Sequence, residues 1–251
     1  MLRRLEKPLG LTAAFAIAAV LSLAGLAVAE TPVKIGEDIE AEFDAGFSPK
    51  TLSKAKPTPI GFDLSGRIWT ERLEWVPPLE ELLLKADRRA GISVEGIPAC
   101  GWRQLQADTA HVRAACRKSL IGAGETQIDI LFPSGPIPVE SELLAFNGGR
   151  RGGVTTLFLH AYITVPAPAA IVTRVKVKKV DEGRYGLRAR AMVPKIAGGS
   201  GSITRFELGL RKGILSATCP QDRRLQLGLG FGFADGTFLS GAVVRTCGRR
   251  R

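Results

Sequence analysis

Short runs in which apolar and polar residues alternate dominate the chain from about residue 56 onward, and turn residues separate them roughly every ten positions. Alternation with a period of two places every second side chain on one face, as in a β-strand with one buried side. Residues 60–64 and 128–132 both show this pattern. Strands and turns at this spacing are typical of antiparallel sandwiches and barrels. We therefore predict an all-β fold, mainly an antiparallel sandwich or half-barrel.

Two alternating runs stand out from the rest. In residues 157–165 both faces are fairly apolar, which predicts a central strand of the sheet. Residues 225–233 place Leu and Phe on one face, whereas Gly228, Gly230 and Gly232 leave the other face nearly bare. A bare face permits close approach of a backbone or ring from the protein or from a ligand.

Two hairpins are predicted near these runs. Asp235-Gly236 suits the positive φ of a tight turn, so it should join residues 225–233 to residues 238–246. A second hairpin is expected at residues 172–193, with a three-residue loop ending in Gly183. Its register would set three pairs opposite each other, namely Val177 with Leu187, Lys176 with Arg188 and Arg174 with Arg190.

Helical signals are few. Residues 108–118 predict one short helix, because Asp108 or Thr109 can cap it and alanines favour it, with Gly122 and Gly124 ending it. Residues 79–87 fit either a helix or a strand, and the local signal favours the helix.

Four cysteines occur, at positions 100, 116, 219 and 247. They lack the paired spacing of a metal site, and in an exported protein an even set favours disulfides. Of the three possible connectivities, Cys100–Cys116 with Cys219–Cys247 is the most economical, because both loops are local. The first bridge would tie the short helix back to the chain before it.

The N-terminus has the three zones of an export signal. Basic residues at positions 3, 4 and 7 precede an uncharged apolar run at 9–26, and Ala27-Val28-Ala29 forms a cleavage pattern. The run approaches the roughly 20 residues that span a bilayer, but its small residues and the cleavage pattern favour removal over anchoring. No second long apolar run follows, so we expect no integral membrane segment after cleavage, and a secreted or cell-envelope location. We divide the chain into a signal peptide (1–29), an extended acidic leader (30–55), a single β domain (56–247) and a basic tail (248–251).

Four groups of short motifs are spread over roughly residues 47–247. They are Gly96-Ile97-Pro98-x-Cys100 with a helix ending in Cys116, Gly122-x-Gly124 and a strand into Phe132-Pro133; Leu144-Ala145-Phe146-Asn147-Gly148-Gly149; Ile196-Ala197-Gly198-Gly199; and Ala234-Asp235-Gly236-Thr237. This order resembles a family of uncharacterised exported bacterial proteins with a signal peptide and two cysteine pairs. The resemblance implies no activity, and it favours a strand at residues 79–87.

Basic residues exceed acidic ones, with 35 Lys and Arg against 24 Asp and Glu. Cleavage would remove three basic residues and one acidic residue, leaving 32 against 23, a net charge of +9. This balance suits an anionic cell-wall polymer or lipid head groups, without specific nucleic-acid recognition. The candidate polyanion-binding residues come from the 172–193 hairpin and from the Gly-rich segment 147–153, and they are Arg174, Lys176, Arg188, Arg190, Arg150 and Arg151.

Both sources have simpler interpretations. The segment 147–153 reads more readily as a hairpin loop than as an anion-binding nest. Like charges facing each other on the hairpin are either solvated or neutralised by acidic groups, for which residues 37–44 are an internal candidate. Trp69, Trp75 and Trp102 could stack a sugar ring, although buried anchors are the commoner use of scattered tryptophans.

Catalytic chemistry is poorly represented. His111 and His160 belong to no zinc-binding pattern, and Ser202 fails the spacing of a nucleophile elbow. We therefore assign no catalytic residue, metal or cofactor, and expect an exported, non-catalytic envelope or extracellular protein that binds an anionic polymer. The alternative is a small-molecule or lipid carrier, or a hydrolase, with a cavity between the Gly-striped strand and the central strand. A cavity of several hundred Å³ with converging polar groups would favour that alternative. The sequence fixes neither the ligand nor the oligomeric state.

Overall fold

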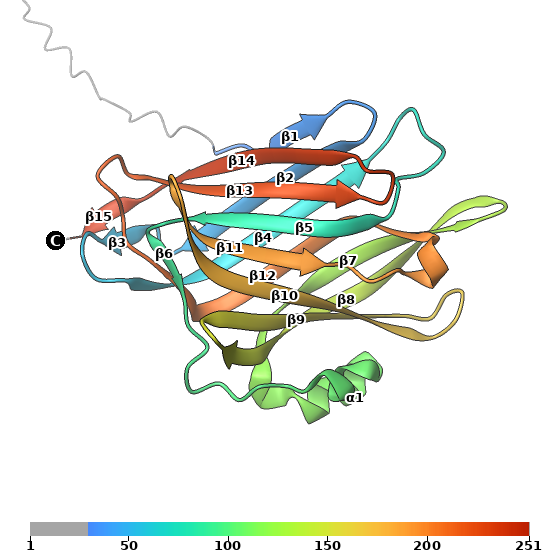
Figure 1. Cartoon of the computed structure of the whole chain (residues 1–251), viewed down its shortest axis with the longest axis horizontal. Coiled ribbons are helices and arrows are strands. Elements are labelled where there is room, and N and C mark those ends of the chain that lie inside the picture. The colour runs from blue at the N-terminus through green and yellow to red at the C-terminus, as the bar shows by residue number, and fades with distance from the viewer. Residues whose placement is uncertain (1–29, 251) are drawn as a thin grey trace, which may run out of the picture.

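One strongly curled antiparallel sheet forms most of the computed structural model, which describes residues 30–250 (Figure 1). The export signal expected at residues 1–29 lies outside the described residues. The strand order is β1-β2-β4-β12-β7-β8-β9-β10-β11-β5-β13-β14, with β6 paired to β12. The all-β prediction is confirmed, and the sheet curls into a nearly closed barrel. The strands of this sheet are β1 (Val33–Gly36), β2 (Glu40–Ser48), β4 (Thr58–Trp69), β5 (Leu79–Asp87), β6 (Ala90–Ile92), β7 (Leu120–Phe132), β8 (Gly135–Arg151), β9 (Val154–Ile163), β10 (Ala169–Glu182), β11 (Tyr185–Met192), β12 (Gly201–Ala217), β13 (Arg224–Phe233) and β14 (Phe238–Thr246).

Side chains close the seam where the two ends of this strand order meet. Gly241 of β14 faces β1 and β2, since a Cβ at that position would lie 3.0 Å from Ile35 Cγ2 and 3.1 Å from the ring of Phe43. Arg245, which is 7% exposed, reaches across the seam. Its Nε donates to the carbonyl oxygen of Ala45 at 2.7 Å, and its guanidinium pairs with Asp44. At this seam the buried Arg245 guanidinium, and not a ladder of backbone hydrogen bonds, therefore joins β14 to β2.

The chain near both ends of the described range belongs to the fold, which corrects two expectations. Residues 30–55 are not a leader ahead of the domain, because β2 pairs along its whole length with β4 and buries Phe43 and Phe47. The basic tail expected at 248–251 is a strand for most of its length: β15 (Gly248–Arg250) pairs in parallel with β3 (Thr51–Ser53).

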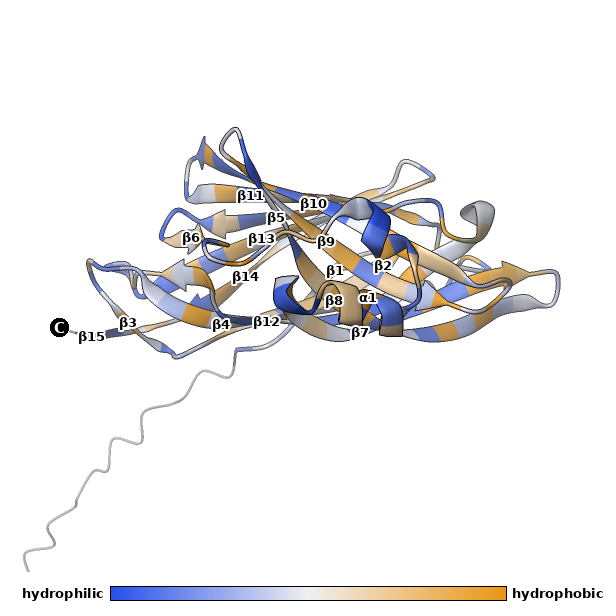
Figure 2. Ribbon diagram, turned by 90° about the horizontal axis from the view of Figure 1, so that it is seen from below, coloured by the Kyte–Doolittle hydropathy of each residue, from blue (hydrophilic) through white to orange (hydrophobic). Residues whose placement is uncertain are grey.

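A strap between β6 and β7 covers the outer face of β8, β9 and β10 (Figures 1 and 2). It contains α1 (Thr109–Ala115), flanked by 3₁₀ turns η1 (Trp102–Gln106) and η2 (Arg117–Ser119). The predicted helix is confirmed, with Asp108 accepting the first-turn bond from the backbone N–H of His111 at 3.0 Å. The predicted terminators are wrong: Gly122 and Gly124 lie in β7, where a Cβ on Gly124 would overlap the carbonyl of Glu207. Those glycines let β7 and β12 approach.

Both local disulfides are present, Cys100–Cys116 and Cys219–Cys247. The first bridges the two ends of the strap segment that packs on Leu144, Phe146 and Phe158. Asn147 fixes the start of that segment, because its Nδ2 donates to the Ile97 carbonyl at 2.7 Å and its own carbonyl accepts from the backbone N–H of Cys100 at 2.8 Å. The Gly-rich segment is thus a bulge plus a hairpin turn at Gly152-Gly153, as the simpler interpretation held.

The remaining predictions, which concern strands and hairpins, differ in outcome. Residues 79–87 form the strand β5, and the Asp235-Gly236 hairpin joins β13 to β14 with Gly236 at φ +88°. The 172–193 hairpin exists, but its predicted register is wrong by two residues. Val177 faces Ala189 and Lys176 faces Arg190, because the turn is Gly183-Arg184 and a bulge between Lys179 and Glu182 places one extra residue on β10.

Candidate functional site

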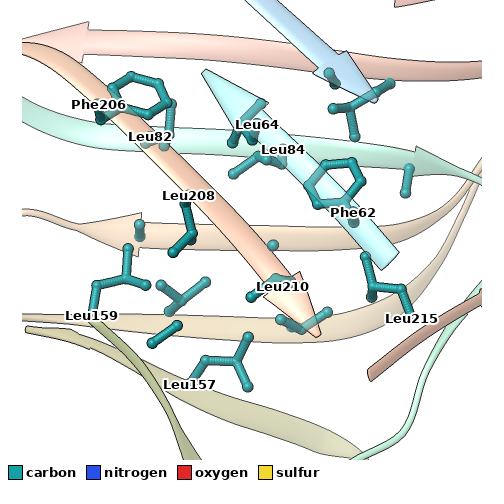
Figure 3. A pocket seen from close by; sticks show the side chains of 18 of the residues that line it. Phe62, Leu64, Leu82, Leu84, Leu157, Leu159, Phe206, Leu208, Leu210 and Leu215 are labelled. Atoms are coloured by element: carbon teal, nitrogen blue, oxygen red, sulfur yellow. The ribbon is translucent and has the colours of Figure 1, made fainter. Parts of the chain in front are cut away.

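The barrel encloses a cavity of about 240 Å³ walled almost entirely by hydrocarbon (Figure 3). The inward faces of several strands supply the wall, because alternation points every second residue to the interior. Figure 2 shows apolar and polar residues alternating along the strands. In Figure 3 leucine and phenylalanine side chains from opposite walls converge on one space. The larger lining residues shown there are Phe62, Leu64, Leu82, Leu84, Leu157, Leu159, Phe206, Leu208, Leu210 and Leu215.

Space remains inside because the opposite walls do not meet. Leu84, Leu159 and Leu208 point inward and line the cavity, yet each is only half-buried. Small residues widen the gap, with Ala86 on β5 and Ala189 on β11 among the lining residues. Interiors are normally packed as densely as organic crystals, so half-buried inward leucines indicate an unfilled volume.

One end of the barrel is closed by packed side chains. Phe43, Ile68, Ile130 and Phe231 come from four different strands, and each is at most 2% exposed. The Phe43 and Phe231 rings lie 6.0 Å apart, centroid to centroid. All four belong to the main core but not to the cavity wall. This cluster bounds the cavity at one end, where Leu79 and Ile203 line it, and the cavity wall continues from there to the other end of the barrel.

Polar lining groups gather at that other end. Asp87, 4% exposed, accepts from Arg184 Nε at 2.9 Å and from the backbone N–H of Arg89 at 3.0 Å. Gln226 donates from Nε2 to the hydroxyl of Tyr185 at 2.8 Å. Arg245 also lines this end and pairs with acidic side chains from the start of the described chain.

One of these acidic side chains, Glu30, has a perturbed pKa. Burial alone would raise the pKa of the Glu30 carboxyl, but hydrogen bonds from Thr246 and Lys50 bring it below its usual value of 4.5. The carboxylate therefore stays charged beside Arg245, which lies 3.4 Å from it at Nε. A paired, charged seam borders the apolar wall at this point.

Residues of β13 and β9, the two strands named in the carrier alternative, are among those that line the cavity. Leu225 and Leu227 line one side and Leu157 and Leu159 the other. The bare Gly face of β13 turns away from the cavity and is covered by rings of the protein itself. A Cβ on Gly230 would lie 2.6 Å from Phe238, and one on Gly228 would lie 3.0 Å from the hydroxyl of Tyr185.

The residues proposed to bind polyanions lie on the outer surface and several already have partners. Arg188 pairs with Glu182, and Arg190 Nε lies 2.5 Å from Glu81. The acidic partners thus come from the hairpin itself and from β5, not from residues 37–44. Arg174 stacks over the ring of Trp102 at 5.1 Å.

The other three residues proposed for polyanion binding, Lys176, Arg150 and Arg151, are exposed, and within residues 30–250 no salt bridge involves them. Arg150 and Arg151 end β8 at the Gly152-Gly153 turn, whereas Lys176 lies on the outer face of β10. Of the six candidates, Arg188 and Arg190 therefore have acidic partners within the described range, and Arg174 stacks on Trp102.

A second hollow, of about 580 Å³, lies on the outer surface near Trp69 and Trp75. Its polar wall includes Asp129, which accepts from Gln127 Nε2 at 2.9 Å and from Thr204 Oγ1 at 3.1 Å. Trp69 carries Lys34 over its ring at 5.1 Å. These polar groups satisfy one another, and the hollow lacks the hydrocarbon wall of the interior cavity.

His160, which the alternation assigns to the outer face of β9, is fully buried beneath the strap. Its Nε2 donates to the Ala107 carbonyl at 3.0 Å, and its Nδ1 has no hydrogen-bond partner in the described part of the chain. Burial lowers the pKa of His160 below its usual 6.5. The imidazole is therefore a neutral packing residue that holds the strap to the barrel.

Stability should fall in acid because of this histidine. An unfolded chain protonates it near pH 6.5 and the folded chain at lower pH, so its contribution is complete above that pH and is lost below it, at up to about 1.4 kcal/mol per pH unit. We expect the free energy of unfolding to drop more between pH 7.5 and 5 for the natural protein than for His160→Gln. Urea titrations at several pH values measure this, and equal slopes would contradict it.

No family model, curated protein or solved structure matches this chain. Among residues 30–250, no helix has both the length and the apolar composition needed to cross a membrane. The two disulfides are typical of proteins in an oxidising compartment.

Proposed function

We propose that the protein is an exported binding protein that holds one small apolar or amphipathic molecule inside its barrel. The observation that carries this proposal is the set of inward-pointing leucines left half-buried around the interior cavity. Ligand sites are typically concave and mainly apolar, with a few polar groups that orient the ligand. The buried Asp87 and Arg245 at one end of the cavity are such groups.

The cost of an empty cavity supports an occupant. Cavities created by truncating core residues cost about 24 cal/mol per Å³, so a volume of about 240 Å³ corresponds to roughly 6 kcal/mol. That is a large part of the 5–15 kcal/mol by which whole domains are typically stable. A volume of this size in a barrel with well-packed walls is therefore better explained by a ligand than by poor packing.

Different observations support export and support binding in preference to hydrolysis. The signal pattern at residues 1–29 and the disulfides support a secreted or envelope location, where an apolar molecule needs shielding from water. The charged residues that line the cavity are already paired with protein groups, Asp87 with Arg184 and Arg245 with Asp44. The partners of Arg188 and Arg190 lower the charge available for a polyanion, so the cavity is the better-supported site.

Filling the cavity should abolish binding without unfolding the barrel. Ala189 lines the cavity on β11, so Ala189→Phe places a ring in the empty space. We expect the affinity for the neutral fluorescent probe N-phenyl-1-naphthylamine to fall at least about tenfold, with a melting temperature equal to or above that of the natural protein.

The matched control adds the same ring outside the barrel. Ala123 is exposed on β7, and Ala123→Phe should leave probe affinity unchanged. The smaller change Ala189→Leu covers the case in which the phenylalanine overpacks the interior. A folded Ala189→Phe variant that binds the probe as tightly as the natural protein would overturn the proposal.

A further inference from the structure

The two ends of the barrel carry opposite charge. At the left end in Figure 1, three turns meet, and hydrogen bonds tie them into a continuous rim. The backbone N–H of Thr218 donates to Arg89 O at 3.1 Å, that of Cys219 to Ser53 O at 2.9 Å and that of Cys247 to Arg223 O at 2.9 Å. The exposed basic residues of this rim are Lys54, Lys56, Arg88, Arg89, Arg223 and Arg224.

Acidic residues of the rim neutralise only part of this charge. Asp222 pairs with Arg184 at 3.2 Å, and Asp181 pairs with Arg88 at 3.2 Å. At the opposite end the balance reverses. There, the β1–β2 turn and the loop after β4 carry Glu37, Asp38, Glu71 and Glu74.

The cavity extends toward the basic rim. Ala90 and Leu225 line the cavity and are half-buried, and the residues directly before them in the chain are Arg89 and Arg224. At the acidic end, core residues such as Ile68 and Phe231 are completely enclosed. Both ends contain packed residues, since Leu52 and Ala217 at the basic end are at most 1% exposed. Ala90 and Leu225 nevertheless bring the half-buried cavity wall directly up to Arg89 and Arg224.

The dimensions of the cavity limit what it can hold. Lining residues on β10 run from Ile171 to Val177, a length of about 20 Å at about 3.3 Å per residue. A volume of about 240 Å³ over such a length is narrow. It suits one slim hydrocarbon chain better than a broad polycyclic ligand or a two-chain lipid.

We infer that the occupant is a single-chain amphiphile with an anionic head group, either carboxylate or phosphate, whose chain lies in the cavity and whose head lies at the basic rim. This inference rests on the proposed function and adds the class of ligand. Basic side chains at the mouth of an apolar cavity attract an anionic head before the chain is desolvated. Arginine contributes in addition, because its planar guanidinium binds carboxylate and phosphate oxygens in pairs.

Calorimetric titration with four twelve-carbon probes, each below its micelle concentration, tests the head-group preference. The probes are dodecanoate, dodecyl phosphate, 1-dodecanol and dodecyltrimethylammonium. In low salt we expect the two anions to bind at least about tenfold more tightly than the cation, and salt to shrink this difference. The ratio of the two anions distinguishes a fatty acid from a phosphate-bearing lipid.

Charge-removal variants locate the head group. Lys56, Arg89 and Arg224 are exposed and form no salt bridge within the described range, so replacing all three with Gln should spare the fold. We expect this triple variant to bind both anions about tenfold more weakly and 1-dodecanol unchanged. The control removes the same charge from the strap, as Arg103→Gln, Arg117→Gln and Lys118→Gln, and should leave all four affinities unchanged.

The outcomes separate the two proposals. Binding of none of the four chains would overturn the proposed function itself. Equal affinity for all head groups, or loss of anion binding in the strap control as well as in the rim variant, would overturn only the anionic assignment. Binding to vesicles of anionic lipid without binding of any monomeric chain would make the rim a membrane-docking surface and would also overturn the inference.

Discussion

Replacing Phe231 with alanine is expected to lower the free energy of unfolding by about 3–5 kcal/mol, the range for truncating a buried aromatic side chain. Phe231 is fully buried on β13 and contacts the ring of Phe43 from the far side of the seam. The pair sits at the closed end of the barrel, among side chains that leave no solvent access. Removal of the ring leaves a void in a region that cannot collapse easily, because strands on all sides are hydrogen-bonded.

The same substitution should change which ligand fits. The void left by Phe231 adjoins the interior cavity, since Leu82, its direct partner on β5, lines that cavity. A chain of sixteen carbons should then raise the melting temperature of Phe231→Ala more than a chain of twelve carbons does. In the natural protein the longer chain should have no such advantage.

A neighbouring phenylalanine supplies the control. Phe238 on β14 is 54% exposed and covers Gly230 from outside the barrel. Phe238→Ala removes the same atoms and should cost on the order of 1 kcal/mol without affecting chain-length preference. Urea denaturation and thermal shifts measure both effects. If Phe231→Ala costs no more than Phe238→Ala, the closed end is not packed as described.

Alternation along the sequence predicted most of the strands because one face of nearly every strand is apolar. It failed at residues 40–46, where Glu, Asp and alanine share the segment and the charge drew attention away from the buried Phe43. The charged side chains of β2 occupy its outer face, so they are compatible with a strand inside the sheet. Small inward residues make such a pattern hard to read.

The register in which strands pair was harder to predict from the sequence than the positions of the strands. Parity correctly placed Val177 and Ala189 on the same face, but parity is unchanged by a shift of two residues. The bulge near Asp181 decides the shift, and a bulge depends on how the strand meets its neighbours. The outer-face partners changed accordingly. Glu81 was missed because its proximity to Arg190 depends on the pairing of β5 with β11, and Glu182 was missed because its proximity to Arg188 depends on the turn and bulge of the hairpin.

The cavity could be placed but not measured from the sequence. The sequence analysis named β13 and β9 as two sides of a cavity, but it did not establish that the Leu face of β13, and not its Gly face, lines the interior. Whether opposite walls touch depends on the number, tilt and stagger of the strands around the barrel, which the pattern of one strand does not contain. The basic rim was missed for a related reason, because Arg89, Arg224 and Lys54 come from turns far apart in the chain.

Removing the Cys219–Cys247 disulfide is the other change expected to have a large effect. The bridge closes a loop of 28 residues, so its loss should lower the free energy of unfolding by about 3–4 kcal/mol through the entropy gained by the unfolded chain. Its environment adds a functional consequence. Phe47, Leu52 and Ile60 pack around the bridge, and Phe47 and Ile60 also line the cavity.

The double variant Cys219→Ala with Cys247→Ala should therefore release a bound chain faster as well as unfold more easily. The Cys100–Cys116 bridge is the control, because it lies on the outside of the barrel. Its loop is shorter, with a sequence separation of 16, but the entropic cost varies only with the logarithm of loop length. Removing this bridge should cost about 3 kcal/mol and leave the release rate unchanged. Stopped-flow displacement of N-phenyl-1-naphthylamine measures that rate, and denaturation measures stability. Equal release rates in the two double variants would contradict this prediction. They would show that a disulfide beside the cavity-lining residues affects release no more than one on the outside of the barrel.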